Sequence, residues 1–356
     1  MKKERNSSLE LLRIISMFLI IAHHYVVHGD FVYTLETNPF AVIYLQAISI
    51  FGRPACMIFA LITGYFMIEA DTKNKFYRRI IPTLFRMIFC SLVVFGVVYL
   101  FDGSYSLRDF VVSFIPFSND EYWYVNTYVC FFFFIPFINE LLLRMDRKRF
   151  RQLLTVIFIV YFVLNTVLLN EYSFGWLYFM LNLYAFGAYY RLYGNKNGDN
   201  RKNLLISLGC AALMIASSAG IVAAGYFFEK ESLLSRVTPF ASYSNILSFG
   251  FAYYLFVYFA NKNFVSKTVN LIASTVLSIY MLHDRILIRQ LIWFRWFPNA
   301  EYVNNPYLHS IVKIVSIFVI CMLIDFVRQL TLSRLFKKTV YKKADEVLDK
   351  VNKSFL

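Results

Sequence analysis

Two ionisable side chains, Arg13 and His24, stand eleven residues apart in the first apolar segment of the chain. Eleven residues make about three turns of an α-helix, which puts both side chains on one face and about 16 Å apart along the axis. Histidine titrates near neutral pH and suits general-base catalysis, whereas arginine keeps its charge and binds phosphate or carboxylate groups. The spacing therefore predicts a cationic anchor near a water face and a catalytic histidine deep inside the protein.

Plainer roles for these side chains stay open. Arg13 could pair with Glu10, one turn earlier on the same helix, and His24 could be satisfied by a neighbouring backbone carbonyl or hydroxyl. His23 points about 100° away from His24 and is expected to be structural or interfacial. His28 shares the His24 face one turn further out, where it is expected to meet water.

The composition of the chain is that of a polytopic membrane protein. Of its 356 residues, 59% are hydrophobic and only 16% are charged, with a mean hydropathy of +0.54. Soluble domains average about 45–50% apolar and about 25% charged residues. The five cysteines lie in apolar runs and form no CxxC pair, which favours packing over disulfide or metal roles. We therefore predict an all-α integral membrane protein.

Ten apolar segments approach the ~20 residues that a spanning helix needs, so we predict about ten transmembrane helices. They lie at residues 9–28, 41–68, 80–101, 123–143, 152–170, 174–190, 204–228, 244–260, 268–289 and 308–330. Most of the 36 lysines and arginines fall in alternate connections, and the positive-inside rule places these connections and both termini in the cytoplasm. This distribution, rather than nucleic-acid binding, accounts for the net charge of +14.

The chain is thus expected to be a multi-pass protein of the inner or plasma membrane. Residues 1–334 form the predicted transmembrane domain. Residues 335–356 combine basic residues with helical spacing, which predicts an amphipathic tail along the cytoplasmic membrane surface.

A basic cluster at the start of the third apolar segment is a candidate anion site. Arg78 and Arg79 precede Pro82, and Arg86 lies one or two turns deeper than Arg79. Arginine side chains at the cytosolic face could clamp phosphate groups. A positive-inside flank, with Pro82 as an ordinary helix start, explains the same residues equally well.

Four residues are candidates for the outer side. His283 and Asp284 lie toward the outer end of the ninth segment and could form an acid–base or acceptor-binding group, unless Arg285 simply neutralises Asp284. Arg53 interrupts the second segment together with a following proline. Trp123 opens the fourth segment and could stack on a sugar ring, or belong to the aromatic belt at the membrane surface.

Together these elements resemble the integral-membrane acyltransferase-3 family, whose bacterial members are O-acyltransferases of surface glycans. The matching elements are Arg13 with His24, residues 59–66 with Thr63 where serine is usual, and residues 78–82, 123–124, 184–191 and 279–283. No single element is specific, but their order, spacing and orientation agree with the family pattern along most of the chain.

The resemblance implies transfer of an acyl group, most simply acetyl, from cytoplasmic acetyl-CoA or another acyl-CoA to a hydroxyl of a cell-surface glycan or exopolysaccharide. His24 and Arg13 would be catalytic, and no metal is expected. The guanidinium groups of Arg78, Arg79 and Arg86 would hold the CoA phosphates. Expected partners are the glycan acceptor, membrane lipid and the polysaccharide-synthesis machinery, without nucleic acid.

Three other functions compete with acyl transfer. A glycan or lipid transporter or flippase of the envelope would also need charges within the membrane, but no inverted repeats are visible. A glycan polymerase is expected to carry basic residues in long outer loops, and the predicted outer loops of this chain are short and poor in them. A purely structural membrane protein would leave the intramembrane charges unexplained.

Overall fold

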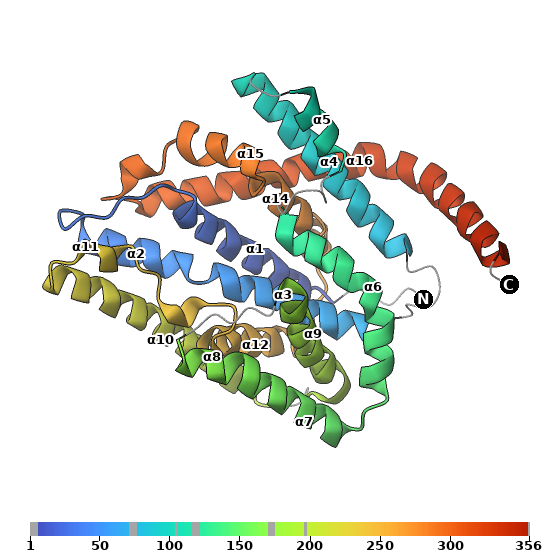
Figure 1. Cartoon of the computed structure of the whole chain (residues 1–356), viewed down its shortest axis with the longest axis horizontal. Helices are drawn as coiled ribbons and strands as arrows, with labels where there is room; N and C mark the ends of the chain where they lie inside the picture. Colours follow the sequence, from blue (N-terminus) through green and yellow to red (C-terminus); the bar gives the residue numbers. More distant parts are fainter. Residues whose placement is uncertain are drawn as a thin grey trace.

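The computed structural model describes residues 6–70, 77–103, 106–115, 122–169, 175–195 and 198–354, without the side chains of 77–79 and 332–354. Throughout these ranges the regular structure is helical, and they contain no strand (Figure 1). The all-α class predicted from the sequence is therefore confirmed.

The α-helices of the described residues follow one another in chain order. They are α1 Ser8–Val27, α2 Pro39–Ser49, α3 Gly52–Met67, α4 Tyr77–Asp102, α5 Leu107–Ser113, α6 Trp123–Leu143, α7 Arg147–Ile157, α8 Leu164–Val167, α9 Trp176–Tyr193, α10 Asn200–Phe227, α11 Glu231–Leu234, α12 Ile246–Ala260, α13 Lys267–Ala273, α14 Val276–His283, α15 Ile286–Arg289 and α16 Tyr307–Ser354. Two π-helical segments, Phe158–Val163 and Gln290–Arg295, join α7 to α8 and extend α15.

Seven helical segments of the described chain are long and apolar enough to cross a membrane, or eight if one bent pair counts as a span. This is fewer than the ten spans expected from the sequence. One reason is length, because the 15 residues of α12 extend over only about 22 Å. Another is polarity, because α9 carries Asn182, Arg191 and several tyrosines.

The predicted span 268–289 is not a single straight helix. It is broken after His283, and the two parts, Lys267–His283 and Ile286–Arg295, are bent by 77°. Arg285 adopts an extended backbone conformation at the break. The sequence prediction of one continuous helix here was therefore wrong, since average hydropathy carries no information about a break between two apolar segments.

A second interruption separates α2 from α3 at residues 50–51. Asn38 caps the start of α2 by accepting a hydrogen bond from the Phe40 backbone, and Pro54 lies in the first turn of α3, where proline is tolerated. The interruption gives α3 its own starting turn, which carries Arg53.

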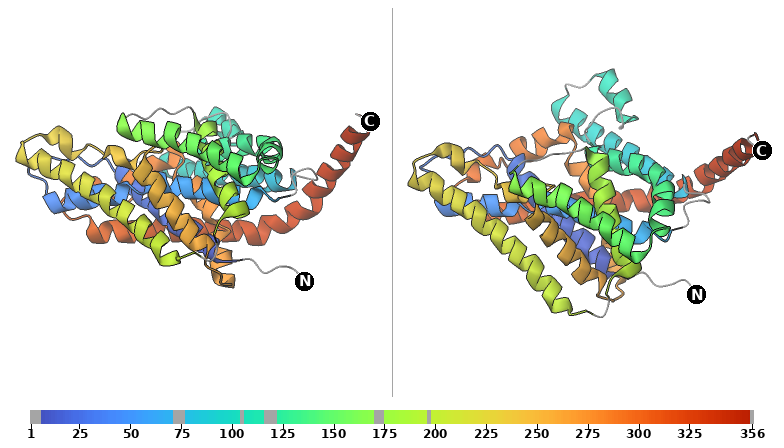
Figure 2. Two further views of the ribbon diagram at one scale, coloured as in Figure 1. Left: turned by 90° about the horizontal axis from the view of Figure 1, so that it is seen from below. Right: turned by 60° about the horizontal axis from the view of Figure 1, so that its bottom comes forward.

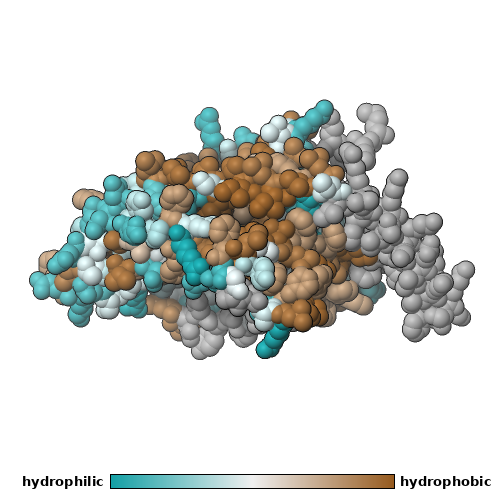
Figure 3. Space-filling model, turned by 90° about the horizontal axis from the view of Figure 1, so that it is seen from above, coloured by the Kyte–Doolittle hydropathy of each residue, from teal (hydrophilic) through white to brown (hydrophobic). Residues whose placement is uncertain are grey.

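The surface of the molecule fits a membrane-embedded bundle. Figure 3 shows apolar side chains gathered in a broad band over the middle of one face, with hydrophilic side chains concentrated at its left end. The helix α16 is 48 residues long in all, and its C-terminal part projects beyond the other helices (Figure 2). The tail is predicted to be amphipathic, but this prediction falls on side chains outside the described residues.

Connections predicted to be cytoplasmic meet at one end of the bundle. The Ser7 backbone donates to the Phe264 carbonyl at 2.8 Å, and the Tyr193 hydroxyl donates to the Met145 carbonyl at 3.4 Å. At the other end, the predicted outer loops are joined by hydrogen bonds from Leu35 to Glu231, from Asn38 to Asn304 and from Arg295 to Asp102. The assignment of the first end to the cytoplasm stays a prediction from the basic residues.

The helix α1 lies at the centre of the bundle with α3 beside it, and α9 packs on α3 with the backbones of these two helices in direct contact. A Cβ atom on Gly64 of α3 would lie 2.1 Å from the Tyr184 carbonyl oxygen, and one on Gly187 of α9 would lie 2.0 Å from the Leu61 carbonyl oxygen. Glycine at both positions therefore allows the close approach that fixes α3.

We expect Gly64→Ala to destabilise the protein by about 1–3 kcal/mol or more, because the added methyl group forces α3 and α9 apart. The midpoint of thermal unfolding of the purified protein in detergent would measure this loss. Gly96→Ala in α4 is the matched control, since its methyl group meets none of the described residues within 4 Å and alanine favours the helix by up to about 1 kcal/mol. Equal midpoints for the two variants would contradict the backbone contact.

Candidate functional site

Two cavities lie end to end within the bundle. The first, which we call the Arg13 cavity, has a volume of about 370 Å³, and the second, the His24 cavity, about 220 Å³. The residues that line both are Ile20, Cys56 and Tyr280. Arg13 and His24 share one face of the continuous helix α1, as their spacing predicts, but each lines a different cavity.

The Arg13 cavity carries two guanidinium groups and several hydroxyls. Arg13 pairs with the buried carboxylate of Glu10 at 2.8 Å, as the plainer of its two predicted roles required, while its side chain also lines the cavity. Arg86 donates from Nη1 to the Ser274 carbonyl at 3.3 Å, and its Nε is buried without a hydrogen-bond partner among the described residues. Such an unsatisfied donor at a cavity wall is suited to an anionic or carbonyl ligand.

The other two predicted phosphate ligands cannot be placed in the same way. Arg78 and Arg79 lie in the first turn of α4, and their side chains are outside the described residues. Their role stays a prediction, whereas Arg86, two turns further along α4, reaches the Arg13 cavity.

A chain of hydrogen bonds orients the His24 ring. His283 Nδ1 lies 2.6 Å from the Ile279 carbonyl oxygen, which can only accept, so this nitrogen carries the proton. His283 Nε2 then accepts from His24 Nδ1 at 3.0 Å when both rings are neutral. The arrangement leaves His24 Nε2 unprotonated, which is the state that a general base needs.

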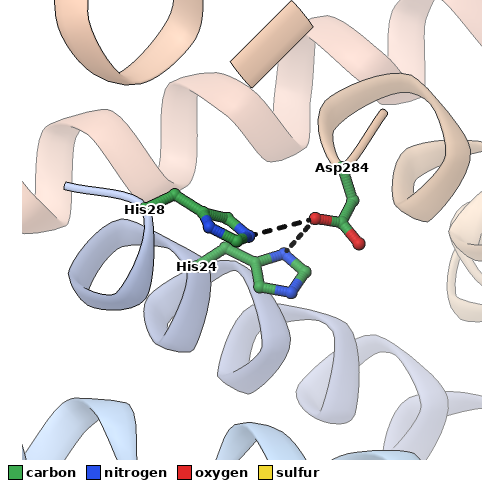
Figure 4. A group of neighbouring side chains, drawn as sticks. All are labelled: His24, His28 and Asp284. Atoms are coloured by element: carbon green, nitrogen blue, oxygen red, sulfur yellow. Dashed lines mark ion pairs between the residues drawn. The ribbon is translucent and has the colours of Figure 1, made fainter. Parts of the chain in front are cut away.

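The Asp284 carboxylate joins the groups of the His24 cavity. Its Oδ1 lies 3.4 Å from His24 Nδ1 and 3.4 Å from His28 Nε2, as Figure 4 shows, and 2.8 Å from Arg289 Nη2. Arg289 Nε also donates to the Asp284 backbone carbonyl at 3.0 Å. The predicted neutralising partner, Arg285, instead donates to the Ser91 carbonyl and the Ser113 hydroxyl.

An arginine and aromatic rings complete the wall of the His24 cavity. Arg53 lies over the Tyr243 ring, with 5.5 Å between the guanidinium carbon and the ring centroid. The Trp123 ring lies against Trp176, with 4.0 Å between the ring centroids and an angle of 35° between the ring planes. Of the four predicted outer-side residues, Arg53, Trp123 and Asp284 therefore line the cavity, while the fourth, His283, is fully buried behind His24.

His23 also reaches the His24 cavity but has a structural partner. Its Nδ1 donates to the Ser49 carbonyl at 2.5 Å, which ties α1 to the end of α2. A Cβ on Gly52 would lie 2.4 Å from the His23 side chain, so this ring is tightly enclosed. The contacts agree with the structural role expected from its position on the helix.

Sequence reasoning gave no site role to Cys56, Tyr280 or Arg289 of these cavities, although Tyr280 belongs to the family element at residues 279–283. Tyr280 precedes Asp284 by four residues, so helical spacing would have placed it on the same face. Arg289 reaches Asp284 across the break between α14 and α15, and no helical period predicts that contact. Cys56 was assigned to core packing with the other cysteines.

Three of these side chains could also hold a metal ion. His24, His28 and Asp284 each offer a ligand atom, and the three atoms lie within 4.8 Å of one another, a set that zinc accepts. The Arg289 guanidinium already contacts the same carboxylate oxygen, so a divalent cation here would meet a fixed positive charge. A hydrogen-bonded cluster fits these contacts better than a metal centre, and the absence of a metal stays a prediction.

Comparison with known proteins gives a family match. A family model described as an acyltransferase domain matches residues 6–326, which include every residue named in the two cavities. No curated protein and no solved structure matches the chain.

We expect Asp284→Asn to destabilise the protein by about 3 kcal/mol, because it leaves the Arg289 charge without its buried partner. The control is Asp102→Asn, which removes the partly exposed pair with Arg295 and should cost about 0.2–1 kcal/mol. Thermal unfolding in detergent measures both. An Asp284→Asn variant as stable as the control would show that the carboxylate does not hold the break between α14 and α15.

Proposed function

Because the chain belongs to the acyltransferase-3 family, we propose that this membrane acyltransferase moves an acetyl group from cytosolic acetyl-CoA to a hydroxyl of a cell-surface glycan. The family resemblance noted in the sequence is thereby confirmed. It supports acyl transfer over the transporter alternative. The acyl group, the CoA donor, the glycan acceptor and the plasma membrane location belong to the proposal.

The observation that carries the proposal is the pair of cavities that meet at Ile20, Cys56 and Tyr280. One cavity offers guanidinium groups and the other a histidine with a free ring nitrogen. A donor and an acceptor entering from opposite ends would meet at these three side chains. Transfer between two sides of a membrane requires such a meeting point.

The Arg13 cavity suits the acyl donor. Its volume of about 370 Å³ suits the pantetheine arm and acyl group rather than the whole of CoA. The nucleotide would then stay at the cytosolic mouth, near the start of α4 with Arg78 and Arg79. Arg86 would bind the arm or a phosphate through its unsatisfied Nε, and Arg13 would add a second positive charge.

The His24 cavity suits the acceptor. Trp123 presents an aromatic face of the kind that stacks on sugar rings, and Arg53 offers donors to sugar hydroxyls. His24 Nε2 would take the proton of the attacking hydroxyl, and the Asp284 carboxylate would stabilise the imidazolium that forms. His24 would return this proton to the departing thiolate, which leaves the site ready for another turnover.

We expect His24→Ala to lower acyl transfer by about 10²–10⁴-fold, because the general base is lost, while His23→Ala keeps substantial activity. Membranes containing each variant would be incubated with radiolabelled acetyl-CoA, and the label in surface polysaccharide would be counted. Protein amounts and unfolding midpoints must match the wild type. An active His24→Ala variant would remove His24 from the mechanism, and wild-type membranes that transfer no label would refute the proposed donor and acceptor.

We expect Arg86→Gln to raise the KM for acyl-CoA by about 10–100-fold, since a charge-assisted hydrogen bond contributes about 1.5–3 kcal/mol. Arg86→Lys should recover only part of this loss, because an ammonium group lacks the planar fork. Arg295→Gln at the other end of the bundle is the control and should leave this KM unchanged. An unaltered KM in a folded Arg86→Gln variant would limit Arg86 to a structural role.

A further inference from the structure

The Tyr280 side chain is exceptional among the residues where the two cavities meet. It lines both cavities, it is only 6% exposed, and its hydroxyl has no hydrogen-bond partner among the described residues. A buried hydroxyl left unpaired costs about 1–3 kcal/mol. A polar group held at that cost beside two cavities points to a ligand that pairs with it.

The surroundings of Tyr280 leave its proton available. The backbone N–H of Tyr124, in the first turn of α6, lies near the Tyr280 oxygen without the geometry of a hydrogen bond, and as a donor it cannot accept the Tyr280 proton. Trp123 lines the His24 cavity and Tyr124 the Arg13 cavity, so the start of α6 also lies where the cavities meet. The partial positive charge of a helix N-terminus adds to the attraction for an anion at this point.

Tyr280 is also tied to the groups that orient His24. It lies one helical turn before Asp284 on α14, and its ring centroid is 6.4 Å from that of His283. Arg13 lines one cavity and His24 the other, so a reacting carbonyl that both must serve belongs at the junction.

We propose that the Tyr280 hydroxyl donates a hydrogen bond to the oxyanion that forms on the acyl carbonyl during transfer. This inference rests on the proposed acyl transfer. As the acceptor oxygen bonds to the carbonyl carbon, His24 takes the hydroxyl proton and negative charge moves onto the carbonyl oxygen. The tetrahedral intermediate then re-forms the C=O bond, the C–S bond breaks, and the thiolate takes the proton from His24. Tyr280 keeps its own proton throughout and acts as a catalytic hydrogen-bond donor.

The test is Tyr280→Phe, which removes one oxygen atom and keeps the ring. We expect kcat for acetyl transfer to fall about 10²–10³-fold, the loss typical of one oxyanion donor, with KM for acyl-CoA within about threefold of wild type. The unfolding midpoint should be unchanged or higher, because an unpaired buried hydroxyl is removed. Tyr33→Phe is the matched control, since Tyr33 also has a buried, unpartnered hydroxyl among the described residues but lines neither cavity, and its activity should equal wild type.

A second variant keeps the test independent of folding. Site-specific replacement of Tyr280 by 3-fluorotyrosine preserves size and strengthens the O–H donor, so kcat should be at least that of wild type. If the wild type is active, either of two results would overturn the role of Tyr280. One is an unaffected kcat in Tyr280→Phe, and the other is a fluorotyrosine variant as slow as Tyr280→Phe. Failure of the wild type to transfer acetyl from acetyl-CoA would instead overturn the proposed function.

Discussion

The pairing of Asp284 with Arg289 is the interaction on which the rest of the site depends. A carboxylate that is 2% exposed inside a membrane protein needs a compensating charge, and a broken helix needs partners for its free backbone groups. Arg289 meets both needs at once, because one guanidinium contacts the side-chain oxygen and the backbone carbonyl of the same residue. The Arg289 guanidinium stabilises the break, and the break brings the Asp284 carboxylate toward α1.

The surroundings of His24 on α1 depend on that pairing and on the packing of α3. Asp284 and His283 approach His24 from the end of α14, and Arg53 and Cys56 of α3, the helix that the glycine contact holds against α9, line the same cavity. The His24 ring is therefore oriented by α14 and faces a cavity whose wall includes α3. Preorganisation of this kind lets an imidazole change its protonation state without rearrangement of its neighbours.

Sequence patterns reached the local features of this site and missed the tertiary ones. The helical period correctly put Arg13 and His24 on one face, because that relation depends on a single helix. It could not show that Ile20, Cys56 and Tyr280 divide the space beside that face, since these residues come from three helices. Hydropathy likewise located the apolar segment 268–289, but the break within it depends on Arg289, whose contact with Asp284 exists only after the chain has turned by 77°.

The three side chains between the cavities have a consequence for the cell as well as for the reaction. A continuous water-filled path through the bundle would conduct protons down the electrochemical gradient, and each elementary charge that leaked would dissipate about 2.3 kcal/mol per 100 mV. An aliphatic chain, a thiol and a phenol line both cavities where they meet, and they present only neutral groups to such a path. In the proposed reaction, a neutral acyl group would pass from one carrier to another at this junction without the transfer of a net charge.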